Sequence, residues 1–396
     1  MPQIKPEVES FARIKVIGVG GSGKNTVNHM INSKVKGVDF IAINTDAQDL
    51  HHSQAKKKIH IGKNLTHGLG TGMNPELGKR AVEETKEEIL EAIKGADMVF
   101  IAGGMGGGTA SGACPIIARA AKESGCLTVA VVTKPFFFEG QQRMRIAEVA
   151  IDELKQAVDA LIIIPNDRLL QTIEKNITAK NAFAVCDNIL REAVEGISDL
   201  ITTPGIINID FADIRSIMEN AGAALMGIGS ASGENRAVEA AKAAISSPLL
   251  EISINGAKGV LFSIAGGDDI TMFEIQDAAK IITESIDNNA KIIFGTVRDD
   301  KLKKGELKIT VIASNFSDNY SSSRKAASLF QTFGANEGES GKGKIFNIVP
   351  SQPHKEVQKP VAEEKKSESK QTPPPMEDND DDWSAVPAFL RRSKLK

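Results

Sequence analysis

A glycine-rich run near the start of the chain has residue types that can bind an anion. The run GVGGSG at 18–23 continues from an apolar stretch that predicts a strand, and a helical pattern follows it. Glycines let the backbone approach a ligand closely, and the N–H groups at such a strand-to-helix turn can face a phosphate. The run therefore predicts a phosphate loop, although a purely structural turn fits the same residues.

Three nucleotide-binding templates fit this run when it is taken alone. They are the GxGxxG of a dinucleotide fold, the GxxxxGK of a P-loop and the first loop of tubulin-class proteins. The P-loop template fails because Asn25 stands where a Ser or Thr would hold magnesium. The dinucleotide template stays open because Asp46 lies at the end of the second predicted strand, where an acid can bind a ribose.

A second glycine run, GGMGGGTASG at 103–112, decides among the templates. It also follows an apolar strand and enters a helix, and neither rival template has two such loops in one domain. Thr109 can cap this helix and offer a hydroxyl to a phosphate. Two anion sites at neighbouring positions of a sheet suit a di- or triphosphate.

From residue 13 onward, strand-like apolar runs alternate with longer helical patterns. This order is typical of an α/β, doubly wound, Rossmann-like domain, in which helices cover both faces of a mostly parallel sheet. Helices are predicted at 75–94, where Pro75 suits the first turn, and at 109–124. The predicted strands are 14–19, 39–44, 98–102, 127–132 and 161–165.

The second half of the chain predicts a long helix followed by an α+β domain. Apolar residues recur at helical spacing over 181–201. The elements predicted after it are helices at 211–218 and 235–244 and strands at 259–265, 290–296 and 307–313.

Beyond residue 317 the composition shifts to Ser, Lys, Glu, Gln and Pro, which predicts a disordered linker. An apolar cluster with the only Trp follows it, and such a tethered cluster is typical of a binding peptide. We divide the chain into an N-terminal extension at 1–12, a nucleotide-binding domain at 13–180, a central connecting helix at 181–203, a C-terminal domain at 204–316, a linker at 317–382 and a partner-binding peptide at 383–396.

Composition excludes several classes of function. A net charge of −3 gives no overall field toward nucleic acid or anionic membranes. Cys114, Cys126 and Cys186 have neither disulfide nor metal-ligand spacing, which indicates buried thiols in a reducing cytosol. No apolar run reaches the length of about 18 residues needed for a membrane span, and the N-terminus lacks a signal-peptide pattern. We expect a cytoplasmic protein with no protein-bound metal and no direct nucleic-acid partner.

Further motifs follow the second glycine run, which is similar to a GGGTGSG signature. They are TKPFFFEG at 133–140, IPND at 164–167 and NIDFADIR at 208–215. In order and spacing, the motifs over residues 12–316 resemble the tubulin/FtsZ family of GTPases, and its FtsZ branch in particular. The resemblance implies a self-assembling GTPase that binds GTP and GDP, with Mg²⁺ carried on the nucleotide phosphates.

The resemblance also implies the residues that hold the nucleotide. Glu139, Arg143 and Asn166 would meet the ribose, while Phe183 would stack on guanine and Asp187 would hydrogen-bond its edge. The residues implied for the phosphates are Gly20, Gly21, Ser22, Gly23, Lys24, Asn25, Asn44, Gly106, Gly107, Gly108, Thr109 and Ala110.

Each role has a plain structural alternative. Glu139 and Arg143 are spaced i,i+4 and could be a surface pair. Phe183 could belong to the core. Asp187 follows Phe183 by four residues, so both project from one helix face, which favours a shared role at the base.

Three residues depart from the glycine-rich pattern of the family. Ser22 and Lys24 stand where glycines are usual, and Ala110 replaces a glycine of the signature. Lys24 could add a direct positive charge to the phosphate site. Ala110 falls in the opening turn of a helix, where Ala is more favourable than Gly.

Two acids with catalytic potential begin a predicted helix in the second domain. Asp210 and Asp213 are three residues apart, so their carboxylates can share one face. An N-cap and a first-turn acid explain them without chemistry. Under the resemblance, these acids and Asn208 enter the nucleotide site of the next subunit and position the attacking water, so that hydrolysis follows polymerisation.

The resemblance places the protein in a division ring at midcell beneath the membrane. Two other hypotheses stay open: a tubulin-class filament that moves DNA or another cargo, and an NAD-dependent oxidoreductase. The second glycine run and the lack of an evident catalytic His disfavour the oxidoreductase. Residues that resemble a peptide for membrane-tethering division proteins disfavour the cargo filament; they are Val386, Pro387, Phe389, Leu390, Arg391 and Arg392.

Overall fold

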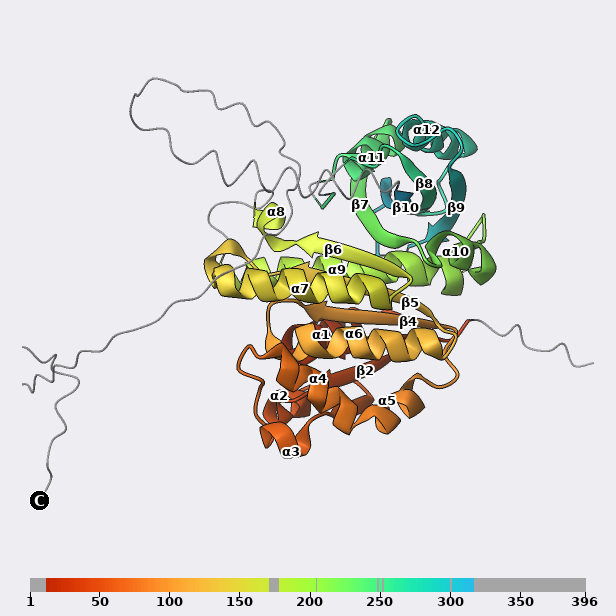
Figure 1. The fold of residues 1–396 in the computed structure, drawn as a ribbon. Helices are drawn as coiled ribbons and strands as arrows, with labels where there is room; N and C mark the ends of the chain where they lie inside the picture. Colours follow the sequence, from red (N-terminus) through yellow and green to blue (C-terminus); the bar gives the residue numbers. More distant parts are fainter. Residues whose placement is uncertain are drawn as a thin grey trace, which may run out of the picture. The chain divides into compact units, whose positions relative to one another are not determined.

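The structure is a computed structural model, drawn as a ribbon in Figure 1. The predicted linker and terminal peptide lie outside the described residues, so those two predictions stay predictions. The residues that the structure describes are 12–170, 178–203, 205–247, 249–250, 253–299 and 301–316.

The described strands form one ten-stranded sheet in the order β3-β2-β1-β4-β5-β6-β7-β10-β8-β9. Neighbours from β3 to β7 pair in parallel, whereas β10 runs antiparallel to both β7 and β8. The strands are β1 Ile14–Val19, β2 Val38–Asn44, β3 Lys57–His60, β4 Met98–Gly104, β5 Leu127–Lys134, β6 Ala160–Pro165, β7 Gly222–Ser232, β8 Ala257–Gly266, β9 Lys291–Arg298 and β10 Glu306–Phe316.

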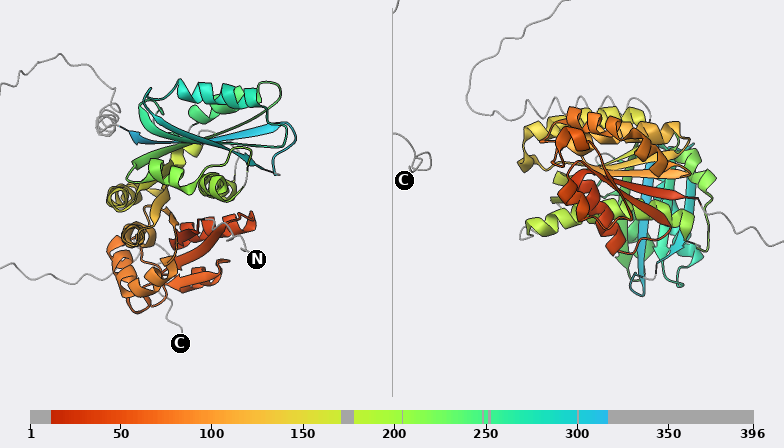
Figure 2. Two further views of the ribbon diagram at one scale, coloured as in Figure 1. Left: turned by 90° about the vertical axis from the view of Figure 1, so that its right-hand side faces the viewer. Right: turned by 90° about the horizontal axis from the view of Figure 1, so that it is seen from below.

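Helices cover both faces of the parallel part of this sheet, as the sequence predicts (Figure 2). One face carries α1 Gly20–Asn32 and α9 Ala179–Thr202, and the other carries α4 to α7. The remaining helices of the first half are α2 Ala47–His51, α3 Lys63–Thr66, α4 Pro75–Glu84, α5 Lys86–Ile93, α6 Gly108–Glu123, the 3-10 turn η1 Phe137–Glu139, α7 Gln141–Ala157 and α8 Asn166–Leu170.

The single helix predicted at 75–94 is wrong, because the chain forms two helices that meet at Thr85. The first begins as expected, with Asn74 as its cap and Pro75 in its first turn. Thr85 has φ −119°, and its hydroxyl donates to the carbonyl of Ala81 at 2.9 Å. A β-branched residue with a local hydrogen bond of this kind competes with regular helix geometry.

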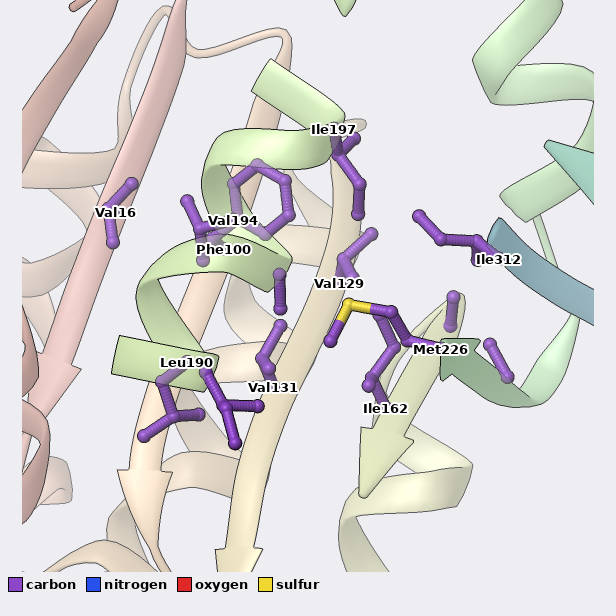
Figure 3. Close-up of a cluster of buried hydrophobic side chains, with 14 of the residues drawn as sticks. Val16, Phe100, Val129, Val131, Ile162, Leu190, Val194, Ile197, Met226 and Ile312 are labelled. Atoms are coloured by element: carbon purple, nitrogen blue, oxygen red, sulfur yellow. The ribbon is translucent and has the colours of Figure 1, made fainter. Parts of the chain in front are cut away.

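The long helix α9 joins the cores of the two halves. Figure 3 shows Leu190, Val194 and Ile197 of α9 against side chains from β1, β4, β5 and β6. Met226 of β7 and Ile312 of β10 belong to the same buried cluster. Because α9 packs on strands from both halves, it fixes the second half against the first.

The second half contains α10 Phe211–Met218, α11 Arg236–Ile245 and α12 Met272–Thr283 beside β7 to β10. Sequence reasoning missed β7 and α12, and it also missed β3. Strand β7 is rich in Gly and Ala, which have low strand propensity. A Cβ on Gly227 would lie 2.0 Å from the Ala244 carbonyl oxygen, so this strand uses small residues to let α11 pack on its backbone.

Among the described residues, no helix combines the length and the apolar character required to cross a bilayer.

A buried arginine ties α11 to the turn before α12. Arg236 donates from Nε to Glu274 Oε1 at 2.6 Å and from Nη1 to Asp269 Oδ2 at 2.7 Å, with only 7% of its side chain exposed. These hydrogen bonds hold the pKa of both carboxyls below their ordinary values. The ion pair therefore stabilises the fold above about pH 4 and loses that effect as pH falls through the lowered pKa values.

We predict that Arg236→Met lowers the free energy of unfolding by about 2 kcal/mol at pH 7, because hydrogen bonds to charged groups are lost. The difference from the wild type should shrink below about pH 4, where the carboxyls are protonated in the variant and then in the wild type. Urea denaturation at both pH values measures it. Arg298→Met, which breaks an exposed pair with Asp268, is the matched control and should change stability by under about 1 kcal/mol.

Candidate functional site

The two glycine runs lie side by side. Strands β1 and β4 are parallel neighbours, with Val19 opposite Gly103, so the segments that follow them leave the same edge of the sheet. A Cβ on Gly20 would lie 3.6 Å from Thr109 Cβ, and one on Gly104 would lie 2.9 Å from Ser22 Oγ. The structure therefore brings the two glycine runs together, with Gly20 beside Thr109 and Ser22 beside Gly104.

Glycine is required in the first run for packing as well as for ligand approach. A Cβ on Gly18 would lie 2.3 Å from the Gly23 carbonyl oxygen, and one on Gly23 would lie 2.4 Å from that of Ala102. Gly20 and Gly106 have φ of +71° and +96°, which an L side chain rarely adopts. These positions hold α1 and α6 close to the strands before them.

Both helices that leave these runs begin without a side-chain cap. The N-cap residues are Val19 for α1 and Gly107 for α6, and neither side chain bonds the first turn. The capping role that the sequence assigns to Thr109 is therefore wrong, because α6 begins at Gly108 and Thr109 lies inside its first turn. Uncapped first-turn N–H groups of two adjacent helices make a site that favours anions.

Three buried threonines meet beside the start of α6. Thr109 Oγ1 lies 2.9 Å from Thr45 Oγ1 and 3.3 Å from Thr71 Oγ1. Sequence reasoning missed Thr45 and Thr71. The segment that carries Thr71 has positive φ at His67, Gly68, Gly72 and Met73, and its repeated glycines were the signal that could have revealed it.

Lys24 does not point freely toward the glycine runs. It is 6% exposed, and its Nζ lies 2.6 Å from Asp49 Oδ1. Asp49 Oδ2 accepts a hydrogen bond from Asn44 Nδ2 at 2.8 Å. Asn44 is buried. Asn25, which follows Lys24 in α1, is exposed.

Helix α9 carries the two residues that the resemblance assigns to the base. Phe183 is 46% exposed, with its ring edge-on to buried Phe136 at a centroid separation of 5.4 Å. Asp187 Oδ1 accepts from Thr26 Oγ1 at 3.0 Å. Burial raises the pKa of Asp187, and the Thr26 hydrogen bond opposes that rise. The half-exposed ring and the carboxylate lie one turn apart, as their spacing predicts.

Of the three residues assigned to the ribose, two are paired with each other and the third is not. Arg143 Nη1 lies 2.7 Å from Glu139 Oε2, and Glu139 Oε1 also accepts from the Phe136 N–H at 2.9 Å. Asn166 opens α8 after β6, and its buried Oδ1 has no hydrogen-bond partner among the residues that the structure describes. An orphaned buried acceptor is costly, so this atom points to a ligand donor such as a hydroxyl.

The acids of the second half lie at the other edge of the sheet. Asp210 caps α10 by accepting from the Ala212 N–H, and Asp213 is an exposed first-turn acid. On the same helix, Arg215 donates to the carbonyl of Gly125, which precedes β5, whereas the glycine runs follow their strands. Figure 1 shows α10 at the end of the sheet opposite to α8.

Asn208 lies with these acids and not with the nucleotide loops. It is exposed, and its Oδ1 accepts from the Gly205 N–H at 2.7 Å. Within one chain, the predicted catalytic residues Asn208, Asp210 and Asp213 are therefore separated from the predicted phosphate site.

Comparisons with known proteins identify the family of the chain. Residues 13–174 match the GTPase domain of the Tubulin/FtsZ family, and residues 222–317 match the C-terminal domain of the FtsZ family. An empty FtsZ dimer from M. jannaschii is 43% identical with a TM-score of 0.74, over 77% of this chain and 89% of that chain. The chain belongs to the FtsZ family. This is a GTPase family, so membership implies that the protein binds guanine nucleotide, and it argues against the NAD-dependent oxidoreductase hypothesis.

Other solved structures share the FtsZ fold. A mutant of FtsZ from M. jannaschii is 44% identical with a TM-score of 0.74, over 77% of this chain and 91% of that chain. CetZ2 from Haloferax volcanii, solved as a GTPγS-bound protofilament, is 20% identical with a TM-score of 0.67, over 81% and 99% of the two chains. At that identity the likeness concerns the fold alone.

We predict that Asp187→Asn raises the free energy of unfolding of the nucleotide-free protein by about 1 kcal/mol at pH 7, because a partly buried charge is removed. The raised pKa of Asp187 means that its charge destabilises the fold at high pH and ceases to do so as pH falls. The gain should therefore vanish in acid. Urea denaturation at pH 7 and in acid measures it, and a loss of stability at pH 7 would contradict the burial argument.

Proposed function

We propose that this FtsZ-family protein assembles head to tail and hydrolyses GTP at the junction between two subunits. The observation that carries the proposal is the separation of the glycine runs and the α10 acids on opposite edges of one sheet. Stacking two chains in the same direction apposes these edges. We propose the same division of labour for the domains, with residues 13–180 binding nucleotide, 181–203 connecting, and 204–316 supplying the acids.

The proposed chemistry uses positioning and charge. The first-turn N–H groups of α1 and α6, with Thr109, hold the phosphates, and Mg²⁺ arrives on the nucleotide. The donors beside the runs are N–H and hydroxyl groups, which suit phosphate oxygens. Asn208, Asp210 and Asp213 of the next subunit orient the attacking water, and one of the two carboxylates accepts its proton. The water oxygen bonds to the γ-phosphorus as the bond to the bridging oxygen breaks, so that GDP leaves.

The nucleoside would lie between α9 and the segments after β5 and β6. Phe183 offers a half-exposed ring to guanine, and Asp187 offers a carboxylate to its N–H edge. Asn166 Oδ1, which has no partner within the described part of the chain, would accept from a ribose hydroxyl. Glu139 and Arg143 form an ion pair, and we propose that it opens toward the ribose when nucleotide enters.

Exposed apolar side chains at both edges support a head-to-tail contact. Phe137 and Phe138 are 79% and 68% exposed in η1, which follows β5 on the edge of the glycine runs. Ile206 is 67% exposed in the segment that leads to α10. Different patches at opposite ends favour a heterologous contact, and contacts of that type build filaments when they do not close into a ring.

The cellular role that we propose is that of a division-ring filament, assembled in the cytoplasm at midcell beneath the membrane. Membership of the FtsZ family supports this role over that of a cargo or DNA-moving filament. We propose that the peptide at 383–396 recruits membrane-tethering division proteins. This part of the proposal rests on sequence, because the peptide lies outside the described residues.

We predict that GTP, and not GDP, drives assembly that sedimentation can detect. Asp213→Ala should keep monomer binding of GTP and lose roughly 100-fold in turnover, because a proton acceptor at the junction is removed. Phosphate release and equilibrium binding measure the two effects. Thr109→Arg blocks the nucleotide site but keeps the acids, whereas Asp213→Ala keeps the nucleotide site. Mixing the two variants should therefore restore turnover at junctions where the acids of a Thr109→Arg subunit meet the GTP of an Asp213→Ala subunit.

Glu219→Ala is the matched control, since Glu219 is an exposed acid at the opposite end of α10. Its turnover should equal that of the wild type. If Asp213→Ala removes GTP binding from the monomer, the acid serves its own subunit and the junction proposal is wrong.

For the tail, we predict that deletion of residues 383–396 leaves GTP-dependent pelleting intact and abolishes recruitment of filaments to vesicles coated with the tethering partner. Val386, Phe389 and Leu390 are spaced i, i+3, i+4, which suits a short helix in an apolar groove. Replacing these three residues by Ser keeps the full length of the chain and removes only the apolar side chains, and it should have the same effect as the deletion. Vesicle binding that survives both changes would rule out this peptide as the anchor.

A further inference from the structure

An ion pair joins the first glycine run to α2, the short helix that follows β2. Lys24 follows the run within α1, and Asp49 lies in α2. The pair is short, at 2.6 Å between Lys24 Nζ and Asp49 Oδ1, and the Lys24 side chain is buried. Asp49 is held at its backbone too, because its N–H donates to Asp46 Oδ1 at 2.9 Å.

The carboxylate of Asp49 is close to the place where phosphate would lie. A Cβ on Gly21 would be 3.6 Å from Asp49 Oδ2, and Gly21 is an exposed first-turn residue of the glycine run. An unpaired carboxylate at this distance would repel a nucleotide phosphate, because like charges interact strongly where protein excludes part of the solvent.

We propose that Lys24 and Asp49 are positioning residues: Lys24 neutralises Asp49 instead of gripping phosphate, and Asp49 in turn fixes Asn44 at the nucleotide site. This inference rests on the proposed nucleotide role of the glycine runs. It assigns a function to Asp49 and replaces the direct phosphate contact expected for Lys24.

The pair also reaches the second glycine run through hydrogen bonds. Asn44 Nδ2 donates to Asp49 Oδ2 at 2.8 Å, and Asn44 Oδ1 accepts from the Thr45 N–H at 2.9 Å. Thr45 Oγ1 then meets Thr109 Oγ1 at 2.9 Å at the start of α6. The ammonium of Lys24 is thus the first member of a chain of partners that holds α1, the end of β2 and α6 in one arrangement.

The charges predict that the two residues act as a coupled pair. Removing Lys24 alone leaves a carboxylate beside the phosphates. Removing the charge of Asp49 alone leaves an ammonium there, which attracts them. Replacing both returns the local charge to that of the wild type, so the two substitutions should be strongly non-additive.

The test is a double-mutant cycle read by binding of a fluorescent GDP analogue to monomers, with no requirement for assembly or turnover. Lys24→Met should weaken binding by at least about tenfold, because the unpaired carboxylate of Asp49 then repels the phosphates. Asp49→Asn, whose amide oxygen still accepts from Asn44, should bind at least as tightly as the wild type. The double variant Lys24→Met/Asp49→Asn should bind within about threefold of the wild type.

Asp46→Asn combined with Lys24→Met is the matched control. It removes a neighbouring carboxylate that does not contact Lys24, and Asn still caps α2, so this combination should bind as weakly as Lys24→Met alone. Urea denaturation of each variant checks that it is folded, and Asp49→Asn alone keeps the proposal testable if Lys24→Met unfolds.

Three outcomes would overturn the proposal while leaving the nucleotide site intact. In the first, the double variant binds as weakly as Lys24→Met, which means that Lys24 grips phosphate directly. In the second, Asp49→Asn alone weakens binding about tenfold. In the third, Asp46→Asn rescues as well as Asp49→Asn. A wild-type protein that binds no guanine nucleotide would instead contradict the proposed function.

Discussion

Strands β1 and β4 lie side by side as parallel neighbours, and their register sets Val19 opposite Gly103. This pairing makes the two glycine runs leave the sheet at one edge, so that the first turns of α1 and α6 can serve one anion. It also demands small residues, because a Cβ on Gly23 would lie 2.4 Å from the Ala102 carbonyl oxygen. The phosphate site is therefore a consequence of how closely these two strands and their helices approach.

The same parallelism explains the separation of the acids. Helix α10 contacts the chain just before β5, at the edge where the parallel strands begin, through Arg215 and the Gly125 carbonyl. The glycine runs lie where those strands end. Groups at opposite edges of a sheet cannot meet within one subunit, and this is the physical basis for proposing that a neighbour completes the site.

Much of the first half could be predicted from the sequence. A strand that is buried on both faces has a continuous apolar sequence with clear limits. The strands predicted at 14–19 and 98–102 therefore begin at the same residues as β1 and β4. The helix predicted at 181–201 matches α9 within two residues at each end. Strand β7 could not be found in this way, since its Gly and Ala residues serve close packing with α11 rather than a pattern of alternating burial.

The sequence by itself determined the local features of the site: two glycine runs after strands, Phe183 and Asp187 one helical turn apart, and the Asp210 cap. Only the tertiary structure decided which distant groups meet. Lys24 pairs with Asp49 because α2 lies beside α1. Thr109 contacts two threonines that no local sequence pattern predicts. The reason is that local spacing encodes elements and their faces, whereas the partner of a buried charge or hydroxyl depends on which elements the sheet order makes neighbours.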